Sequence, residues 1–299
     1  MADGTIVVIG TGGTIAGTAA DASDNVGYRA GELGVDQLVA AVPSLHGLPL
    51  ECEQLSQVDS KDMDVEVWVA LARACRRHLA RPQVAGIVVT HGTDTLEETA
   101  WFLHSVLAPQ RPVVLTCAMR PATALLADGP QNLLDAVCTA RAARSAGVLA
   151  VCAGQVHGAA EVSKVHPYRL DAFSSGDSGP LAMVEEQALR WLREPPGATP
   201  AGPPARDFEP AQWPWVEIVT SHAGADRRAV DALVAQGVRG LVVAGTGNGS
   251  IHHALEGALA DARAKGVQVV RTTRCPNGRI VGGAAGALPA AWNAWVLHG

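Results

Sequence analysis

Charged and aromatic residues are scarce in this chain of 299 residues. Charged side chains make up 17% of the sequence and aromatic side chains 4%, and the formal net charge is −6. An acidic chain with few basic residues offers no general attraction for nucleic acid or for anionic lipid. We therefore expect neither nucleic acid nor a membrane as a partner, and any ligand must be inferred from local motifs.

Long apolar runs and a basic leader are missing as well. The opening residues, MADGTIVVIG, carry an acid where a secretory leader carries lysine or arginine. No uninterrupted apolar run reaches about 18 residues, the length that a transmembrane helix needs. The sequence therefore predicts no export signal and no transmembrane span.

Metal-site patterns are also absent. The six cysteines have neither zinc-site spacing nor a C-x-x-C redox pair, and the ten histidines show no H-x-x-x-H or H-x-x-E-H spacing. We expect no metal. We interpret the cysteines as reduced core thiols of a cytoplasmic protein; they are Cys52, Cys75, Cys117, Cys138, Cys152 and Cys275.

Apolar residues, by contrast, make up 48% of the sequence, which is ample for a large core. Short β-branched runs without period-two alternation predict strands buried on both faces, at residues 5–10, 86–90, 112–119, 147–152, 216–220, 240–245 and 267–273. Amphipathic patterns between them predict helices at 65–80, 96–107, 132–145, 227–237 and 252–266. This alternation predicts an α/β fold with a mostly parallel sheet flanked by helices.

The composition changes sharply at residues 193–214, which hold seven prolines and no periodic apolar face. Such a stretch is typical of a linker between domains. We therefore predict an N-terminal catalytic domain at 1–192, a proline-rich linker at 193–214 and a smaller C-terminal α/β domain at 215–299.

Turns follow four of the predicted strands at the edge where open parallel sheets bind their ligands, and three of the four are rich in glycine and threonine. These turns are GTGGT, THGTDT, CAMRP and GTGNGS, and none has the lysine of a phosphate-binding loop. The dinucleotide-binding spacing G-x-G-x-x-G also fails, because Ile15 stands at its third glycine position. The nearest acid, Glu32, lies among turn residues instead of ending a second strand. We therefore expect no nucleotide cofactor.

Two threonines, Thr14 and Thr93, stand in these turns. Either threonine, or Asp94, would serve simply as a helix cap in an ordinary strand-to-helix turn. Neighbouring strand ends would also place both hydroxyls at one edge of the sheet, and a threonine hydroxyl becomes a useful nucleophile only when a base removes its proton. Tyr28 and Lys164 are the candidate bases; the alternatives are a half-buried tyrosine and a solvated lysine.

Seven motifs in order resemble those of the bacterial L-asparaginases, which are homotetrameric two-domain amidohydrolases. The motifs are TGGTIAG, YRAGELGV, DSKDM, THGTDTLEETA, CAMRPATALLADGPQNL, EVSKVHP and AGTGNGS. The resemblance covers about residues 4–275, and TGGTIAG and HGTDTLEETA are its most specific signatures. It implies hydrolysis of the side-chain amide of L-asparagine to aspartate and ammonia, without a cofactor.

The resemblance also implies the catalytic residues. Thr14 would be the nucleophile on a mobile loop, and Tyr28 would orient or deprotonate it. Thr93, Asp94 and Lys164 would form a second triad that activates a threonine or the hydrolytic water, and Asp94 would also hold the substrate's α-ammonium group. The stretch 17–31, which has no core-forming pattern, would then be a lid that closes over the site.

The same resemblance implies the substrate contacts. Ser60 and Lys61 would clasp the α-carboxylate and amine, Ala118 and Met119 would line the amide end, and a neighbouring subunit would contribute Asn248 and Ser250. The implied substrate-binding residues are Gly13, Ser60, Lys61, Gly92, Asp94, Ala118, Met119, Asn248 and Ser250. We accordingly expect a homo-oligomer, a dimer of intimate dimers.

Two departures from the pattern stand out. Lys61 occupies a position where well-studied secreted relatives carry glutamine, and a firmer grip on the α-carboxylate would favour asparagine over the longer glutamine; the alternative is a solvated lysine without effect. Those relatives also supply a glutamate near the tyrosine from the C-terminal region, whereas here no acid follows Asp261. The apolar tail with Trp292 and Trp295 would pack in place of a final helix or against a partner subunit.

We therefore predict an L-asparaginase that acts through a threonine acyl-enzyme. Three alternatives stay open: a glutaminase-asparaginase of broader specificity, an amidase subunit of a tRNA transamidation complex, and a non-catalytic amino-acid-binding relative. The acidic charge argues against a tRNA partner.

Overall fold

The computed structural model describes residues 4–142, 146–194 and 209–282. The chain divides into two units, Met1–Pro210 and Ala211–Gly299, and each unit has its own apolar core. The division lies inside the predicted linker, of which residues 195–208 fall outside the described ranges. The predicted domain boundaries stay a prediction.

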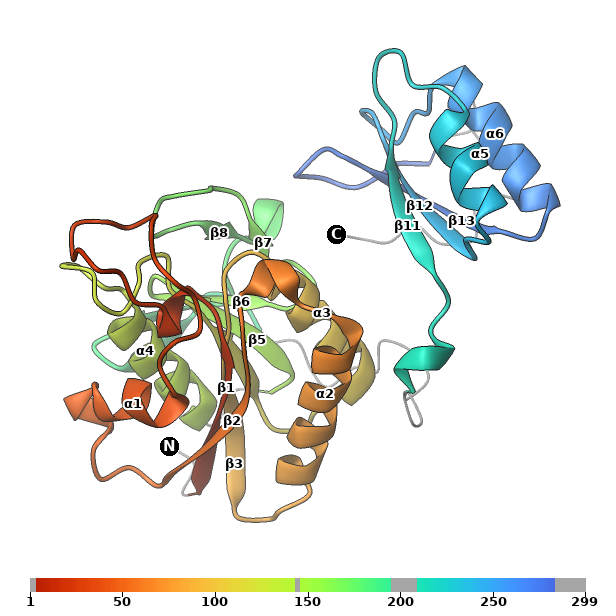
Figure 1. The fold of residues 1–299 in the computed structure, drawn as a ribbon. Helices are drawn as coiled ribbons and strands as arrows, with labels where there is room; N and C mark the ends of the chain where they lie inside the picture. The colour runs from red at the N-terminus through yellow and green to blue at the C-terminus, as the bar shows by residue number, and fades with distance from the viewer. Residues whose placement is uncertain (1–3, 143–145, 195–208, 283–299) are drawn as a thin grey trace. The chain divides into compact units, whose positions relative to one another are not determined.

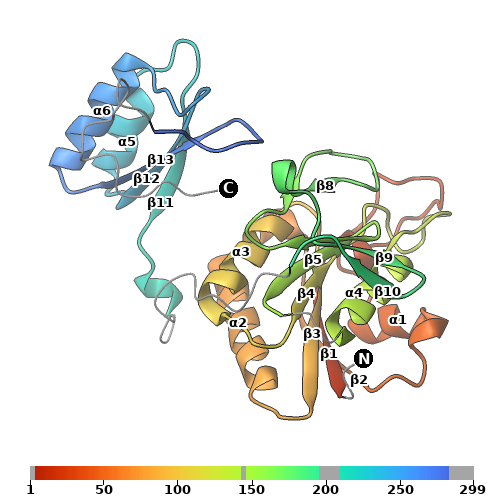
Figure 2. The same ribbon diagram turned by 180° about the vertical axis from the view of Figure 1, so that it is seen from behind.

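The first unit is built on an eight-stranded sheet in the order β10-β9-β6-β5-β4-β3-β1-β2. The strands are β1 (Thr5–Gly12), β2 (Leu50–Val58), β3 (Val84–Thr90), β4 (Val113–Thr116), β5 (Val148–Cys152), β6 (Gln155–Gly158), β9 (Ala182–Glu185) and β10 (Ala188–Trp191). Strands β1 to β5 pair in parallel. The antiparallel strands β6, β9 and β10 extend the sheet to its other edge (Figure 2).

Helices cover both faces of this sheet. Figure 1 shows α1 and α4 on one face and α2 and α3 on the other. Their bounds are α1 (Val35–Ala40), α2 (Val65–Leu79), α3 (Leu96–Leu107) and α4 (Gly129–Arg141). The prediction of a mostly parallel sheet flanked by helices is confirmed. A separate two-stranded ribbon, β7 (Ser163–Lys164) with β8 (Phe173–Ser174), stands beside the main sheet.

Burial explains why these segments form central strands. Every residue of β4 and β5 is buried, as are all but one residue in each of β1 and β3. Strands with helices on both faces need apolar side chains pointing both ways, which gives runs instead of alternation. The edge strand β2 is a mixture of exposed and partly buried positions without regular alternation, and the sequence interpretation did not identify it.

The strand order fixes where a ligand site forms. The parallel part reads β2-β1-β3-β4-β5, so the chain leaves β1 toward one side and resumes at β3 on the other. Connections diverge at this switch point, and a crevice opens there at the carboxyl ends of the strands. Gly12 ends β1 and Thr90 ends β3, so the turns after them lie at that point.

Two predicted boundaries are wrong next to this edge. The strand predicted at 112–119 ends at Thr116, because the backbone N–H groups of Met119 and Arg120 donate to the Asp128 carboxylate instead of to a neighbouring strand, both at 2.9 Å. The helix predicted at 132–145 begins at Gly129, since Asp128 is its N-cap and Pro130 sits in its first turn. The short helix α1 was also missed.

The second unit is a three-stranded parallel sheet, β11 (Val216–Thr220), β12 (Gly240–Gly245) and β13 (Gln268–Thr273), with helices α5 (Arg228–Ala235) and α6 (His253–Ala264). Its core contains buried residues of these helices and strands. The predicted smaller α/β domain is therefore present. Within the described ranges, none of the helices combines the length and apolarity needed to cross a bilayer.

All six cysteines lie in described parts of the chain and are free thiols. Cys75, Cys117 and Cys152 are buried, and Cys52 and Cys138 are half-buried. Cys275 is exposed, so the prediction of a core thiol is wrong at that position: it lies in the turn after β13, the last strand of the small sheet.

Candidate active site

Thr14 begins a single 3-10 turn, Thr14–Ala16, directly after β1. Gly12 and Gly13, which precede it, have φ angles of 109° and 80°, a backbone region that side chains disfavour. The chain therefore bends sharply out of the sheet at this point. Thr14 is buried, and its Oγ1 lies 2.7 Å from the Tyr28 hydroxyl oxygen. The structure thus brings these two predicted residues together.

A short antiparallel bridge carries Tyr28 back to Thr14. Thr18 and Arg29 exchange both backbone hydrogen bonds, at 2.9 and 3.0 Å. A Cβ atom on Gly17 would come within 2.9 Å of the Tyr28 ring. The stretch 17–31 is therefore a loop that returns over the threonine, and Gly17 leaves the space that the tyrosine ring occupies.

The loop 17–31 is tied to the segment that follows β4. Ala122 N–H donates to the Gly17 carbonyl at 2.9 Å, and Leu125 N–H donates to the Ala22 carbonyl at 3.1 Å. The Thr123 hydroxyl accepts from the backbone N–H of Ala19 at 2.9 Å. The candidate lid and the segment 117–125 are therefore held to each other by backbone groups.

A second group of polar side chains follows β3. The Lys164 ammonium donates to Thr93 Oγ1 at 2.8 Å and to Asp94 Oδ1 at 2.5 Å. Its side chain is only 17% exposed, so the alternative of a solvated lysine does not hold. The carboxylate of Glu97, in the first turn of α3, accepts the backbone N–H of Lys164. Thr93, Asp94 and Lys164 therefore form one hydrogen-bonded group.

The two threonine turns touch through glycine backbone. A Cβ atom on Gly13 would lie 2.3 Å from the Gly92 backbone, and one on Gly92 would lie 2.3 Å from the Ser60 hydroxyl. The Ser60 hydroxyl in turn accepts the backbone N–H of Asp94 at 3.2 Å. The turns of Thr14 and Thr93 and the Ser60 loop thus meet at one point of the sheet edge.

Backbone donors are available at the same point. Within the described residues, no group accepts a hydrogen bond from the backbone N–H of Thr14 or of Thr93. Free N–H groups in a glycine-rich turn can stabilise an oxyanion, and each such donor is worth about 3 to 4 kcal/mol in a transition state.

His91, to which the sequence interpretation gave no role, holds the turn that carries Thr93 through a hydrogen bond to Gly92. The Trp68 indole donates to Thr99 Oγ1 at 2.8 Å, and that hydroxyl lies 2.9 Å from His91 Nε2. The Gly92 carbonyl only accepts, so neutral His91 carries its proton on Nδ1, and Nε2 accepts the proton of the Thr99 hydroxyl. Nδ1 therefore donates to the Gly92 carbonyl at 2.7 Å. Burial lowers the pKa of His91 to about 4, which keeps this neutral form.

Ala118 and Met119 lie in the segment after β4 and are called the amide-end wall, after the role that the resemblance implies for them. Ala118 is fully buried, and the Asp128 carboxylate holds the backbone N–H of Met119. A Cβ atom on Gly129 would meet Ile15, the residue after the threonine, at 2.9 Å. Gly129 therefore lies between Ile15 and Ala118, and the role of Ala118 and Met119 at the amide end stays a prediction.

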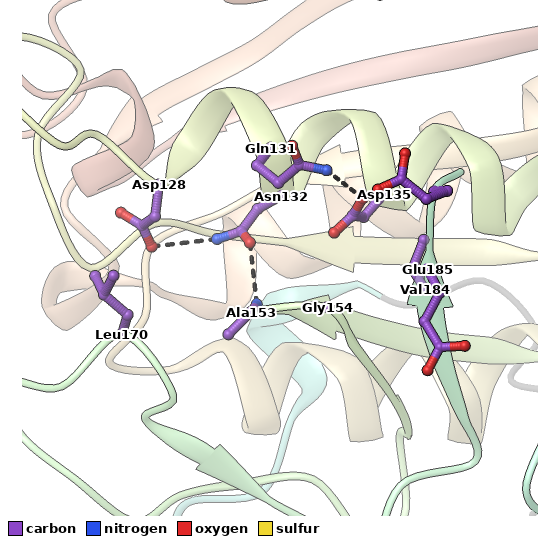
Figure 3. Close-up of a pocket in the computed structure, with 10 residues that line it drawn as sticks. Asp128, Gln131, Asn132, Asp135, Ala153, Gly154, Leu170, Val184 and Glu185 are labelled. Atoms are coloured by element: carbon purple, nitrogen blue, oxygen red, sulfur yellow. Dashed lines mark hydrogen bonds between the residues drawn. The ribbon is translucent and has the colours of Figure 1, made fainter. Parts of the chain in front are cut away.

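A cavity of about 610 Å³ lies on the outer side of this wall. Figure 3 shows Asn132 between Asp128 and Ala153 at one end of the cavity, with Asp135 and Glu185 farther along it. The side chains at its rim are mainly acidic or amide groups, and none of the catalytic candidates lines it.

The Lys61 ammonium forms hydrogen bonds with acidic residues close to it in the chain. It donates to Asp59 at 2.9 Å and to Asp62 at 2.7 Å, and the Lys61 side chain is 59% exposed. The hydrogen bonds that it donates to Asp62 and Asp59 raise the pKa of Lys61 above its usual value. The structure therefore places Ser60, but not the Lys61 ammonium, in contact with the threonine turns.

Asn248 and Ser250 belong to the second unit. The Asn248 side chain exchanges two hydrogen bonds with the backbone of Val281, at 2.7 and 2.8 Å. Ser250 pairs with Thr246 through the backbone in a tight turn. These two residues are not among the groups that the first unit brings together, and Trp292 and Trp295 lie outside the described residues.

Two threonine hydroxyls at the carboxyl edge of an α/β sheet, each hydrogen-bonded to a titratable side chain, form an arrangement typical of enzymes that attack a carbonyl. The chain belongs to the asparaginase family. Residues 5–197 match the family's "Asparaginase, N-terminal" domain, and residues 215–299 match the "Glutaminase/Asparaginase C-terminal domain".

Similar proteins span most of the chain. Glutaminase-asparaginase of Pseudomonas fluorescens biotype A is 37% identical over 284 residues, covering 92% of this chain and 77% of that protein. L-asparaginase 2 of Escherichia coli is 37% identical over 276 residues, covering 91% and 78%. The crystal structure of a probable cytoplasmic L-asparaginase from Campylobacter jejuni matches with a TM-score of 0.87 and 36% identity, covering 94% of this chain and 87% of that one.

The glycine contact between the turns can be tested with Gly13→Ala. We expect kcat to fall by about 10²-fold, because the new Cβ displaces one turn from the other by about 1 Å. Gly47→Ala is the matched control: Gly47 has a φ of 81°, close to that of Gly13, but no atom lies within 4 Å of its would-be Cβ. The control should lose about 1 kcal/mol of stability from backbone strain and keep its kcat. Equal kcat values for the two variants would show that the contact between Gly13 and Gly92 does not matter for turnover.

The buried His91 predicts a pH dependence of stability. The unfolded chain protonates this residue below about pH 6.5, whereas the folded protein resists protonation down to about pH 4. Between these values the unfolded state binds more protons, so the free energy of unfolding falls as the pH drops. Denaturant titrations at pH 7 and pH 5 should show a smaller loss in His91→Gln. A residual loss is expected from His157, whose pKa burial also lowers to about 4; identical losses in variant and wild type would contradict the assignment.

Proposed function

We propose that this protein is an L-asparaginase that hydrolyses the side-chain amide of L-asparagine through an acyl-threonine intermediate. The observation that carries the proposal is a pair of hydrogen-bonded hydroxyls, Thr14 with Tyr28 and Thr93 with Lys164, on two turns whose glycine backbones touch. The names of the similar proteins support the choice of substrate.

In the first half of the reaction, Thr14 Oγ1 attacks the side-chain carbonyl carbon. Tyr28 lies at 2.7 Å, holds the hydroxyl in place and takes its proton. The carbonyl oxygen becomes an oxyanion, which the free N–H groups of the two turns stabilise. Tyr28 delivers the proton to the amide nitrogen, the carbon–nitrogen bond breaks, and ammonia leaves along the wall of Ala118 and Met119.

In the second half, water attacks the ester carbon and the bond to Thr14 breaks. Thr93 is suited to orient this water, because the Lys164 ammonium occupies one side of its oxygen and Asp94 lies next to it. Asp94 also offers its carboxylate to the α-ammonium of the substrate. The products are aspartate and a regenerated threonine.

The α-carboxylate of the substrate would be held by Ser60 and by the backbone of Gly13 and Gly92. Ser60 supports this role because its hydroxyl already contacts the Thr93 turn. The two aspartates around Lys61 compete for its ammonium, so a clamp by Lys61 requires that it leave them when substrate binds.

The complete site would form in a homo-oligomer, a dimer of intimate dimers in which Asn248 and Ser250 of one subunit approach the site of another. The second unit supports this role by presenting both residues in one tight turn after β12. We further propose a cytoplasmic location, which the free state of the described cysteines and the name of the Campylobacter jejuni protein support; the similar protein of Haemophilus influenzae is named as probably periplasmic.

A second candidate activity is glutaminase-asparaginase of broader specificity. It is favoured by the Pseudomonas fluorescens protein of that name. Ammonia release from L-asparagine and L-glutamine under identical conditions separates the two activities. A non-catalytic binder would bind either amino acid and release no ammonia.

Replacement of the nucleophile tests the mechanism. Thr14→Ala should lower kcat for asparagine by about 10³-fold or more, since no other group replaces the attacking oxygen. Thr18→Ala removes a threonine hydroxyl from the same loop and serves as the matched control, with kcat expected within about threefold of wild type. Ammonia release measured at saturating asparagine gives both values. Full activity of Thr14→Ala would overturn the assignment.

The role of Lys61 is tested by Lys61→Gln. If the ammonium grips the substrate, the variant should raise KM for asparagine by about tenfold and narrow the preference for asparagine over glutamine. Ser60→Ala should raise KM in either case. A Lys61→Gln enzyme with unchanged KM for both amides would show that the lysine stays with Asp59 and Asp62.

A further inference from the structure

Two buried cysteines face each other next to the amide end of the site. Cys152 is the last residue of β5, and Cys117 directly follows β4. The parallel register pairs Thr116 with Val151, so the next residue of each strand is a cysteine at the same level. Their sulfur atoms lie 3.0 Å apart, and Cys117 is 1% exposed and Cys152 4% exposed. No other two cysteine sulfurs in the described parts of the chain are in contact.

We propose that Cys117 and Cys152 form a reversible disulfide, and that this bond reduces turnover by shifting the amide-end wall. The proposal that the bond can form rests on the geometry alone. Its effect on turnover rests on the proposed asparaginase function, because that function gives the wall its role.

The backbone geometry is suitable for the bond. Neighbouring strands lie about 4.8 Å apart, within the range of about 4.4 to 6.8 Å that disulfide-bonded Cα atoms span. The sulfurs need to close from 3.0 Å to about 2.05 Å. The two strand ends therefore require a small adjustment, with no rearrangement of the sheet.

Asn132 sets the spacing of these two strand ends. Its side-chain amide donates to the Cys117 carbonyl at 2.9 Å and accepts from the backbone N–H of Ala153 at 3.0 Å. Figure 3 shows it reaching Ala153 on one side and Asp128 on the other. One side chain thus bridges the backbones on which both thiols stand, which holds the sulfurs in register.

The pair is coupled to the site through the chain itself. Ala118 and Met119 directly follow Cys117, and Asp128 fixes the Met119 backbone from the other side. A disulfide closes the sulfur separation by about 1 Å. A displacement of about that size at a reacting centre lowers rates by up to about 10²-fold. The wall cannot absorb it freely, because Ala118 is fully buried.

Hydrogen peroxide is the oxidant we consider, since it is small enough to reach a buried thiol. One thiolate attacks a peroxide oxygen, the O–O bond breaks, and a sulfenic acid and hydroxide form. The second thiolate attacks the sulfenic sulfur, the S–O bond breaks, and the hydroxide that leaves takes up a proton as water. Overall, two thiols and one peroxide give one disulfide and two waters. Burial and the neighbouring Cys152 raise the pKa of Cys117 well above its usual value, so the reaction should be slow at neutral pH and faster in alkali.

The experiment uses the full-length protein carrying Cys275→Ser, which removes the exposed thiol. The protein is treated with hydrogen peroxide, and its peptides are mapped by mass spectrometry without reduction. Ammonia release from asparagine is measured before treatment, after it, and after dithiothreitol. We expect a linked Cys117–Cys152 peptide, a fall in kcat of about tenfold or more, and recovery with dithiothreitol. Because dithiothreitol does not repair oxidised methionine, recovery separates the disulfide from damage to Met119.

Cys152→Ala and Cys152→Ser, each in the same background, are the controls. Either should match the reduced parent before treatment and keep its kcat after peroxide. The proposal is wrong if both thiols stay free after prolonged peroxide treatment at an alkaline pH at which the protein remains folded. The proposed effect of the disulfide on turnover is wrong if the linked peptide forms while kcat is unchanged. Absence of ammonia release from the reduced parent would instead count against the proposed function, since peptide mapping reads the bond without activity.

Discussion

The close approach of Gly13 and Gly92 is the constraint on which the rest of the site depends. Two turns from strands on either side of the switch point can place their threonines at one point only if no side chain stands between the backbones. The polar contacts lie on either side of this approach: Tyr28 bonds to one threonine, Lys164 bonds to the other, and Ser60 contacts the Thr93 turn. The hydroxyl chemistry is therefore a consequence of backbone packing.

A second layer of contacts holds these turns from behind. His91 donates to the carbonyl of Gly92 and accepts from Thr99, which in turn accepts from the indole of Trp68. Asn132 bonds to the strand ends beside the amide-end wall. Both side chains are almost fully buried and bond to backbone groups. Their position explains how the turn after β3 and the segment after β4 keep their geometry, because each is bonded to a buried side chain.

Much of the fold could be predicted, for physical reasons that differ between elements. Strands 216–220 and 240–245 and helix 96–107 agree with the structure to the residue, because continuous apolar runs and helical periodicity mark them clearly. Strand β2 was missed because it is an edge strand with mixed exposure, and α1 because it spans only six residues. The glycine–threonine turns pointed to the site, whereas the contact of His91 with Thr99 and the bonds of Asn132 to the backbone of Cys117 and Ala153 join residues that no local pattern relates.

The central claim is that Thr14 forms the covalent intermediate and Thr93 serves its hydrolysis. The most direct measurement is the intact mass of the Thr93→Val variant, quenched in acid soon after mixing with asparagine, followed by peptide mapping. The account predicts an added aspartyl group on the peptide that contains Thr14, in larger amount than in the wild-type enzyme. An adduct on Thr93 of the wild-type enzyme, or an active enzyme whose Thr14 peptide never carries the group, would contradict it.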